Sequence, residues 1–412
     1  MTMVVGVDVT VVDRIAAALE RHPRFAQKIY TEGEQRYSAG RPQRWASRWA
    51  AKEAVMKLYS SQGERMPAYR DIEVVRAGGG PPRVHVRGEA TPIALSLTHD
   101  GGLAIAVAVS RTPRRRALPE APADLLLAAR PDDGHKGTFG RVVVVAGSRG
   151  FTGAPKLAAL GAARGGAGLV EVCVPASIHS IVAAGCLEVM PTALADGGTG
   201  TLRTQGVEQL RERLRGADAL VIGPGLGRAL DTVPALLEIL TDLPCPAVVD
   251  ADALNIAAEA GFDWRRCGRP VVLTPHPAEM GRLARMSTDA VQGDRNGLAQ
   301  RYADEHGVIV VLKGAETVIA GAAHDLHVDK HRVVALATGG TGDVLSGLIG
   351  SMLAQGLAPR DAAIAGVTIH AQAGLMVQAR RGRAGALASD VIETLPAAQE
   401  LLRQAIEAAS SR

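Results

Sequence analysis

Aromatic residues are scarce in this chain of 412 residues, where Phe, Tyr and Trp together make up only 3%. Binding of single-stranded nucleic acid relies on aromatic side chains interleaved with basic ones, and the sequence shows no such pattern. No apolar run approaches the roughly 18 residues that a membrane-spanning helix needs. The sequence therefore predicts neither a nucleic-acid partner nor insertion into a membrane.

Cysteine is also rare. The four cysteines form no C-x-x-C pair and lack the spacing of metal ligands, and they are Cys173, Cys186, Cys245 and Cys267. Isolated thiols of this kind are typical of a reducing compartment. The stretch from Met1 to Asp8 is too short and too early charged for a secretory signal peptide. We therefore expect a cytoplasmic protein.

Charge is unevenly distributed along the chain. Residues 1–116 carry 19 Lys and Arg against 11 Asp and Glu, a net charge of +8, and the remainder carries 27 against 31, a net charge of −4. The basic part favours an acidic protein or a phosphorylated cofactor as its partner. A Pro- and Arg-rich stretch predicts a linker over 113–133 between one domain at 1–112 and another at 134–412.

The second domain alternates short β-branched runs with helical patterns, which predicts an α/β fold with a mostly parallel sheet flanked by helices. The expected strands are 142–146, 169–174, 219–222, 247–249, 271–273 and 308–312, and the expected helices include 154–164, 207–214, 233–240 and 294–305. Several of these strands run into Gly-, Asp- or His-containing loops. Ligands of open α/β sheets bind at that edge.

The first domain reads as a small α+β unit. We expect helices at 12–21 and 44–60, strands at 4–9, 71–75, 83–86, 93–97 and 103–109, and a turn at 78–82.

The run Ala337-Thr-Gly-Gly-Thr-Gly-Asp343, followed by an apolar helix, is the most informative motif. Its glycines let the backbone approach a ligand, and the helix N-terminus directs free N–H groups toward an anion. Asp343 lies in the first turn of that helix, so the loop combines an anion site with a carboxylate base. A simple helix-capping role for Asp343 is the alternative.

Seven ordered motifs make residues 119–410 resemble the ADP-dependent NAD(P)H-hydrate dehydratases of the ribokinase-like superfamily. Among them are Gly223-Pro-Gly-Leu-Gly227, Thr274-Pro-His-Pro277, Lys313-Gly-Ala-Glu-Thr317 and the glycine-rich loop. In that family a nucleoside phosphate activates the hydroxyl group of hydrated NADH or NADPH, and loss of phosphate restores the dihydronicotinamide. Residues 330–336 depart from the family pattern, which commonly has Asn, a small residue and Gly there.

The resemblance implies specific roles. Asp343 would be the base, and it would share the substrate pocket with Ala154, Gly227 and His276. ADP or ATP would be held by Lys313, Gly314, Ala315, Glu316, Thr317, Gly340, Thr341 and Gly342. Asp250 and Asp252 would either bind magnesium or order their loop.

Residues 3–109 resemble the holo-acyl-carrier-protein synthases, a family of phosphopantetheinyl transferases. Gly6-Val-Asp8, Arg48-Trp-Ala-Ala-Lys-Glu-Ala54 and Leu95-Ser-Leu-Thr-His99 carry this resemblance. It implies that Asp8 and Glu53 bind Mg²⁺, that Glu53 is also catalytic, and that Lys52 and His99 contact coenzyme A. An acidic acyl carrier protein would be the partner, and we expect a homo-oligomer.

The sequence thus predicts a bifunctional enzyme that transfers 4'-phosphopantetheine and dehydrates the S epimer of hydrated NADH or NADPH. Two alternatives remain. The second domain could be a small-molecule hydroxyl kinase, because its Gly-x-Gly-Asp chemistry is shared with such enzymes. The first domain could be a non-catalytic module that only docks a carrier protein.

Overall fold

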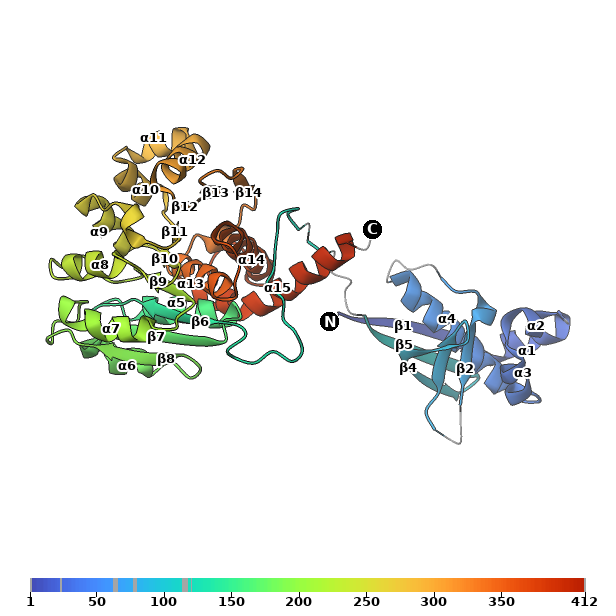
Figure 1. Ribbon diagram of the computed structural model, residues 1–412. Coiled ribbons are helices and arrows are strands. Elements are labelled where there is room, and N and C mark those ends of the chain that lie inside the picture. The colour runs from blue at the N-terminus through green and yellow to red at the C-terminus, as the bar shows by residue number, and fades with distance from the viewer. Residues whose placement is uncertain are drawn as a thin grey trace. The chain divides into compact units, whose positions relative to one another are not determined.

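The computed structural model describes residues 2–22, 24–61, 66–76, 80–112, 118–119 and 121–410. The chain forms two compact units, Met1–Ala117 and Leu118–Arg412 (Figure 1). Each unit has its own sheet and its own hydrophobic clusters. Part of the predicted turn at 78–82 and most of the Arg-rich stretch lie outside the described residues.

The first unit is an antiparallel sheet in the order β1-β5-β4-β3-β2, with helix α4 packed against β1 and β5. The strands are β1 (Thr2–Val11), β2 (Ile72–Val75), β3 (Arg83–Val86), β4 (Glu89–Asp100) and β5 (Leu103–Thr112). The helices are α1 (Val12–Arg21), α2 (Phe25–Ile29), α3 (Glu32–Ser38) and α4 (Pro42–Ser61). The predicted α+β class is confirmed.

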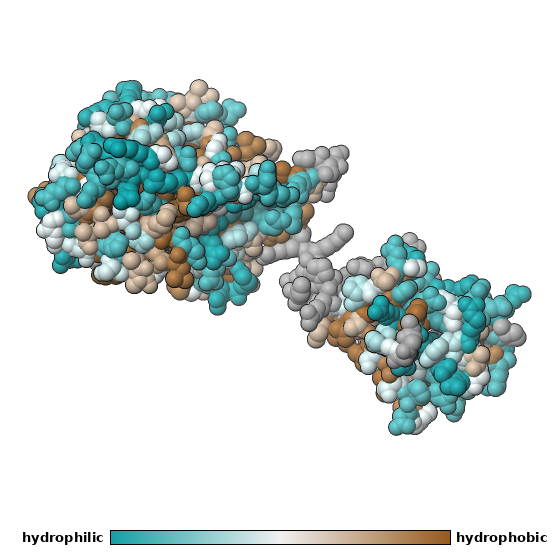
Figure 2. Space-filling view, turned by 60° about the horizontal axis from the view of Figure 1, so that its bottom comes forward, coloured by the Kyte–Doolittle hydropathy of each residue, from teal (hydrophilic) through white to brown (hydrophobic). Residues whose placement is uncertain are grey.

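One face of β1 exposes a row of apolar side chains. Met3, Val5, Val7 and Val9 are between 44% and 66% exposed. They alternate with residues that face α4, because successive side chains of a strand point to opposite faces. Figure 2 shows hydrophobic residues gathered on part of the first unit's surface.

The second unit is built on a nine-stranded sheet in the order β14-β13-β12-β11-β10-β9-β6-β7-β8. Its strands are β6 (Arg141–Val145), β7 (Leu169–Pro175), β8 (Met190–Leu194), β9 (Ala219–Ile222), β10 (Ala247–Val249), β11 (Val271–Leu273), β12 (Ile309–Leu312), β13 (Thr317–Gly321) and β14 (His327–Asp329). All neighbours from β12 to β8 pair in parallel, and β13 and β14 are antiparallel.

Helices cover both faces of this sheet, as predicted for an α/β fold. They are α5 (Gly153–Arg164), α6 (His179–Ala183), α7 (Val207–Leu214), α8 (Thr232–Leu240), α9 (Asp252–Ala260), α10 (Pro277–Ala284), α11 (Thr288–Gly293), α12 (Arg295–His306), α13 (Thr341–Ala354), α14 (Pro359–Arg381) and α15 (Ala388–Ser410). Val142 and Val144 of β6 pack in one cluster with α5, α13, α14 and α15, whereas Val143 and Val145 pack in the other with α7, α8, α9 and α12.

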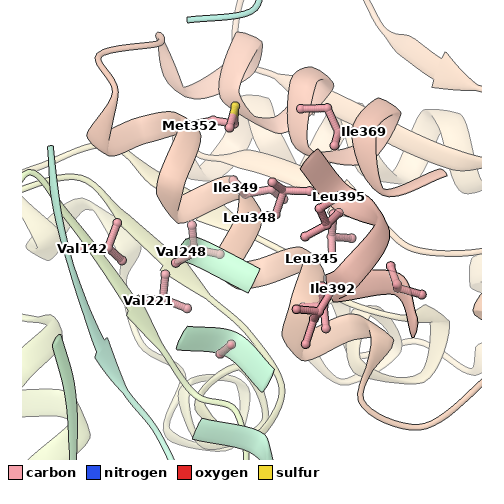
Figure 3. Packing of buried hydrophobic residues seen from close by; sticks show 14 of the residues in the cluster. Val142, Val221, Val248, Leu345, Leu348, Ile349, Met352, Ile369, Ile392 and Leu395 are labelled. Carbon is pink, nitrogen blue, oxygen red and sulfur yellow. The ribbon is translucent and has the colours of Figure 1, made fainter. Parts of the chain in front are cut away.

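Figure 3 shows the first of these clusters. Strand residues such as Val221 and Val248 face Leu348 and Ile349 of α13, and Ile392 of α15 belongs to the same cluster. Helix α13 also lies unusually close to α5. A Cβ atom at Gly347 would lie 1.9 Å from the carbonyl oxygen of Ala158, so the contact requires glycine. The helix that begins at the glycine-rich loop is therefore held against α5 by backbone-to-backbone packing.

Helix α14 is long and apolar enough to cross a membrane by length and composition alone. In the second unit, 83% of its most apolar window is buried, between α13, α15 and the sheet. A core helix of a globular domain has these properties, and we assign α14 to the core. The four cysteines lie within the described residues and form no disulfide with one another.

The segment before β6 packs on the second unit. Asp124 accepts hydrogen bonds from Arg360 and pairs with His327, and Leu125 is buried. Arg130 donates to the carbonyl of Gly166. This part of the stretch predicted as linker is therefore anchored by side-chain contacts.

Three strands of the second unit were not predicted from the sequence. Strand β8 includes Pro191, which removes a backbone donor and is tolerated on a strand at the edge of the sheet. Strands β13 and β14 lie at the opposite edge, where they form an antiparallel extension after β12. The six predicted strands are all present, with bounds that differ by one residue at most.

Candidate active sites

The motif loops of the second unit meet at the carboxyl edge of its parallel strands. Gly147 after β6 donates its N–H to the carbonyl of Pro224 after β9, at 2.8 Å. Lys313 after β12 donates its N–H to the carbonyl of Pro275 after β11, also at 2.8 Å. These bonds hold loops far apart in the sequence side by side, where ligands of such sheets bind.

A cluster of charged side chains surrounds Lys313 at this edge. Its Nζ lies 2.8 Å from Oδ1 of Asp250 and 4.0 Å from Oε2 of Glu279. Burial by itself would lower the pKa of Lys313, but Asp250 and Glu279 outweigh it and raise the pKa. Lys313 is therefore a fully charged cation at the base of the site.

Asp343 lies in the first turn of α13, within the field of this cluster. Burial raises its pKa to about 7, the Asp250 charge adds to the increase, and Lys313 opposes it. A carboxyl group with a pKa near neutrality can accept a proton from a substrate hydroxyl at physiological pH. Gly340 precedes the helix with a φ of 89°, a left-handed conformation that favours glycine.

A cavity of about 500 Å³ opens beside this loop. Six of the eight residues predicted to hold a nucleotide line it: Lys313, Gly314, Ala315, Thr317, Thr341 and Gly342. Gly340 and Glu316 do not line it, and the carboxylate of Glu316 accepts hydrogen bonds from Arg332. The segment that departs from the family pattern forms a wall of the cavity through Arg332, Val333, Val334 and Leu336.

Two of the predicted substrate residues lie close to loops of the site, Ala154 in the first turn of α5 and Gly227 after β9. Gly227 donates its N–H to Oδ2 of Asp252 at 2.9 Å, and a Cβ at Gly225 would lie 2.9 Å from the Cβ of Ala154. Asp250 and Asp252 thus both accept hydrogen bonds from protein groups, and a role in binding magnesium stays a prediction.

His276 lines the cavity beside Lys313 and also caps helix α10. Its Nδ1 accepts the N–H of Ala278 at 3.1 Å, so its ring orientation is fixed. Burial, followed by the positive charge of Lys313, lowers its pKa. A neutral ring that accepts at Nδ1 carries its proton on Nε2.

The two predicted metal ligands of the first unit lie around Tyr69. Asp8 on β1 and Glu53 on α4 both act on Tyr69, whose hydroxyl donates to Glu53. Burial and these two carboxylates raise the pKa of Tyr69. Carboxylate oxygens such as these suit a divalent cation that completes its coordination with phosphate and water oxygens.

Lys57 is a site residue that the sequence reading missed. Its Nζ lies 2.8 Å from Oδ1 of Asp8 and donates to the carbonyl of Val7 at 2.9 Å. It follows Glu53 by four residues on α4, and residues at that spacing share a helix face. The spacing of four residues from Glu53 is the feature of the sequence that could have identified Lys57.

The predicted contact of Lys52 with coenzyme A is wrong. Lys52 is fully buried, its Nζ lies 2.8 Å from Oε2 of Glu34, and it donates to the carbonyls of Tyr69 and Ile72. Consecutive helix residues point about 100° apart, so Lys52 faces the core while Glu53 faces the site.

His99 lies on β4 at a second cavity, of about 360 Å³, that is rich in arginine. Its lining includes Tyr37, Arg41, Arg44, Arg48, Arg76 and His99. The guanidinium groups of Arg44 and Arg48 each lie 4.3 Å from the Tyr37 ring. Burial by itself would raise the pKa of Tyr37, but Arg48 and Arg44 lower it on balance. This cavity is suited to a polyanionic ligand.

Sequence profiles of two families match the chain. The profile described as NAD(P)H-hydrate dehydratase matches residues 142–397, more than half of the chain. The chain belongs to the NAD(P)H-hydrate dehydratase family. The profile of the 4'-phosphopantetheinyl transferase superfamily matches residues 4–108, which confirms the predicted fusion of the two families.

Named relatives of the dehydratase unit include two bacterial proteins. The ADP-dependent (S)-NAD(P)H-hydrate dehydratase of Neisseria meningitidis is 38% identical over 64% of this chain and 86% of its own length. The bifunctional NAD(P)H-hydrate repair enzyme Nnr of Moorella thermoacetica is 40% identical over 71% of this chain and 55% of its own length. The chain spans about half the length of the bifunctional relatives that it matches.

Among solved structures, the ADP/ATP-dependent NAD(P)H-hydrate dehydratase of Bacillus subtilis, co-crystallised with ATP and Mg²⁺, resembles the dehydratase unit. It is 29% identical, with a TM-score of 0.59, and the match covers 67% of this chain and 94% of that one. The ribokinase-like fold predicted for residues 134–412 is therefore confirmed.

His370 is a further residue of the dehydratase unit that the sequence reading missed. It lies on α14, lines the cavity beside the glycine-rich loop and is 7% exposed. Burial lowers its pKa to about 4, and its Nε2 has no hydrogen-bond partner in the described parts of the chain. A single histidine within a helix of mostly apolar residues gives little signal in a sequence.

Proposed function

We propose that the second unit dehydrates hydrated NADH or NADPH, specifically the S epimer, at the expense of ADP or ATP. The observation that carries this proposal is Asp343, a carboxyl group with a pKa near 7 at a glycine-rich helix N-terminus. The names of the Neisseria meningitidis and Bacillus subtilis relatives support the same substrates.

The residues supply three parts of this chemistry. Asp343 takes the proton from the substrate hydroxyl, whose oxygen then bonds to the terminal phosphorus of the nucleotide as the bond to the leaving nucleotide breaks. The first-turn N–H groups of α13 and the charge of Lys313 stabilise the phosphoryl group in transfer. The C–O bond then breaks, and loss of phosphate and of a neighbouring proton restores the ring double bond.

The experiment is an assay of the purified chain on hydrated NADH with ADP and with ATP, followed by absorbance of the dihydronicotinamide. Asp343→Asn keeps the size of the side chain but cannot accept the proton, so turnover should fall on the order of 10²–10⁴-fold. Nucleotide binding should remain. A stable phosphorylated product in place of NADH would instead identify a hydroxyl kinase.

We propose that the first unit transfers 4'-phosphopantetheine from coenzyme A to a serine of an acidic acyl carrier protein. Asp8 and Glu53 would hold Mg²⁺, which neutralises the diphosphate when bound, and Lys57 adds a cation beside Asp8. The arginine-rich cavity with His99 would receive a phosphate-bearing part of coenzyme A. Its remaining positive surface suits an acidic protein.

Mass spectrometry of an acyl carrier protein incubated with the chain and coenzyme A tests the transfer. Covalent addition of phosphopantetheine is the expected result. A complex without covalent modification would make the first unit a docking module.

We also propose that the chain forms a homo-oligomer through the first unit. The exposed apolar row on β1, described above, supports this proposal, because such a row on a sheet face is usually covered. Light scattering of the full chain and of Val5→Glu tests it: the variant should shift toward the monomer, and a wild-type monomer would contradict the proposal.

A further inference from the structure

Arg295, the first residue of α12, lies beneath the loop from Lys313 to Glu316. A single nitrogen of its guanidinium group, Nη2, donates to three backbone carbonyls: Leu312 at 2.9 Å, Lys313 at 3.3 Å and Glu316 at 2.9 Å. Its Nη1 donates to the side chain of Gln292 at 3.2 Å. No motif recognised in the sequence contains this arginine.

The approach of the guanidinium group to the loop is close. A Cβ atom at Gly314 would lie 2.6 Å from Nη2 of Arg295, so a larger residue at this position would push the guanidinium group away from the loop. Burial lowers the pKa of Arg295, and an arginine remains charged at any physiological pH. No carboxylate pairs with it at salt-bridge distance in the described ranges of the chain.

These hydrogen bonds set the direction of a backbone donor. In a trans peptide the C=O and the following N–H point in opposite directions. Because the Lys313 carbonyl points to Arg295, the N–H of Gly314 points to the other side of the loop. Gly314 lines the cavity, and its N–H has no acceptor among the residues that the structure describes.

We propose that Arg295 is the positioning residue of the nucleotide loop, which directs the Gly314 N–H into the cavity as a donor to the adenine nucleotide. This inference rests on the proposed use of the cavity by ADP or ATP. Arg295 itself stays behind the loop and acts through it.

Calorimetric titration of the ligand-free protein with ADP tests the inference without any turnover. Arg295→Ala should weaken ADP binding on the order of 10- to 100-fold, because the loop loses three charge-assisted hydrogen bonds. The ADP affinity of Arg295→Lys should lie between those of wild type and Arg295→Ala, since a single ammonium group cannot reproduce the planar guanidinium contact. Millimolar guanidinium should restore part of the affinity of Arg295→Ala, which a merely structural defect would not allow.

Gln300→Ala is the matched control. Gln300 lies on the same helix and donates to the carbonyl of Gly321 at the far end of β13, away from the nucleotide loop. Its loss should leave ADP affinity within about twofold of wild type, as expected for a change distant from the site. An equal loss in Gln300→Ala would mean that general loosening of α12 explains the effect, and would overturn the inference.

Unchanged ADP affinity in Arg295→Ala also overturns it. If that variant does not fold, Arg295→Lys decides, with unchanged affinity again counting against the inference. A wild-type chain that binds ADP but does not dehydrate hydrated NADH contradicts the proposed function alone. A wild-type chain that binds neither ADP nor ATP contradicts both the inference and the proposed function.

Discussion

At the scale of single residues, both units place a carboxylate and a lysine together, but in different electrostatic settings. Asp8 pairs with Lys57, whose side chain is half exposed, whereas Asp343 lies in the field of Lys313, which pairs with Asp250. Burial raises the pKa of Asp343, because a low-dielectric environment disfavours its negative charge. Asp343 is thereby prepared to take up a proton.

The stability of the second unit should depend on pH through Asp343. Its pKa is about 7 when folded and near 4 when unfolded, so the folded state binds the proton more tightly. Stability should therefore fall as pH rises from about 4 to 7, by an amount on the order of a few kcal/mol, and stay low above pH 7. Asp343→Asn should melt higher than wild type at pH 8, and the gap should narrow at pH 5. An equal gap at both pH values would place the ionisation elsewhere.

Lys52 and Lys57 should respond to substitution in opposite ways. Lys52→Met leaves the buried carboxylate of Glu34 without its cation, so the free energy of unfolding should fall by about 3 kcal/mol in urea titrations. Lys57→Met should stay folded and lose phosphopantetheine transfer. Lys52→Met combined with Glu34→Gln should regain part of the stability. Normal stability of the single Lys52 variant would contradict the burial argument.

At the scale of elements, the parallel strands were the most predictable part of the chain. Runs of Val, Ile and Leu buried on both faces, such as Val142 to Val145, read directly as strands. The directions in which side chains of α4 point were harder to predict. Lys52 and Glu53 belong to one motif, and only the position of the core shows that Lys52 is buried. Contacts through backbone carbonyls, such as those of Arg295, leave no side-chain pattern in a sequence.

The contact between α5 and α13 makes a prediction at this scale. Gly347→Ala would place a methyl group within 1.9 Å of the Ala158 carbonyl oxygen, so the helices must separate. We expect a loss of about 3 kcal/mol in the stability of the second unit, measured by thermal or urea unfolding. Gly293→Ala is the control, because nothing lies within 4 Å of a Cβ atom there. Equal stability of the two variants would show that α5 and α13 can separate without loss.

At the scale of the whole molecule, each site is built from one unit. Asp8, Glu53 and Lys57 belong to the first unit, and Asp250, Lys313 and Asp343 belong to the second. Sequence motifs assigned each part of the chain to the correct family, because each set of motifs falls within one unit. The arginine-rich cavity could not be predicted from the sequence, because the separate segments α3, α4 and β4 all contribute residues to its lining.

The two activities should therefore be separable. Asp8→Ala combined with Glu53→Ala removes the proposed metal ligands, so transfer to a carrier protein should vanish while hydrated NADH is dehydrated at the wild-type rate. Asp343→Asn should show the reverse pattern. Loss of dehydration in the double variant, with its circular dichroism unchanged, would mean that the two sites depend on each other.

The glycine contact between α5 and α13 also limits how the second unit can move. Ala154 stands at the start of α5 and Asp343 at the start of α13, and the backbones of these helices touch along their length. The base and this part of the substrate site therefore behave as one rigid body. Any movement of the second unit on ligand binding should therefore leave the distance between Ala154 and Asp343 unchanged.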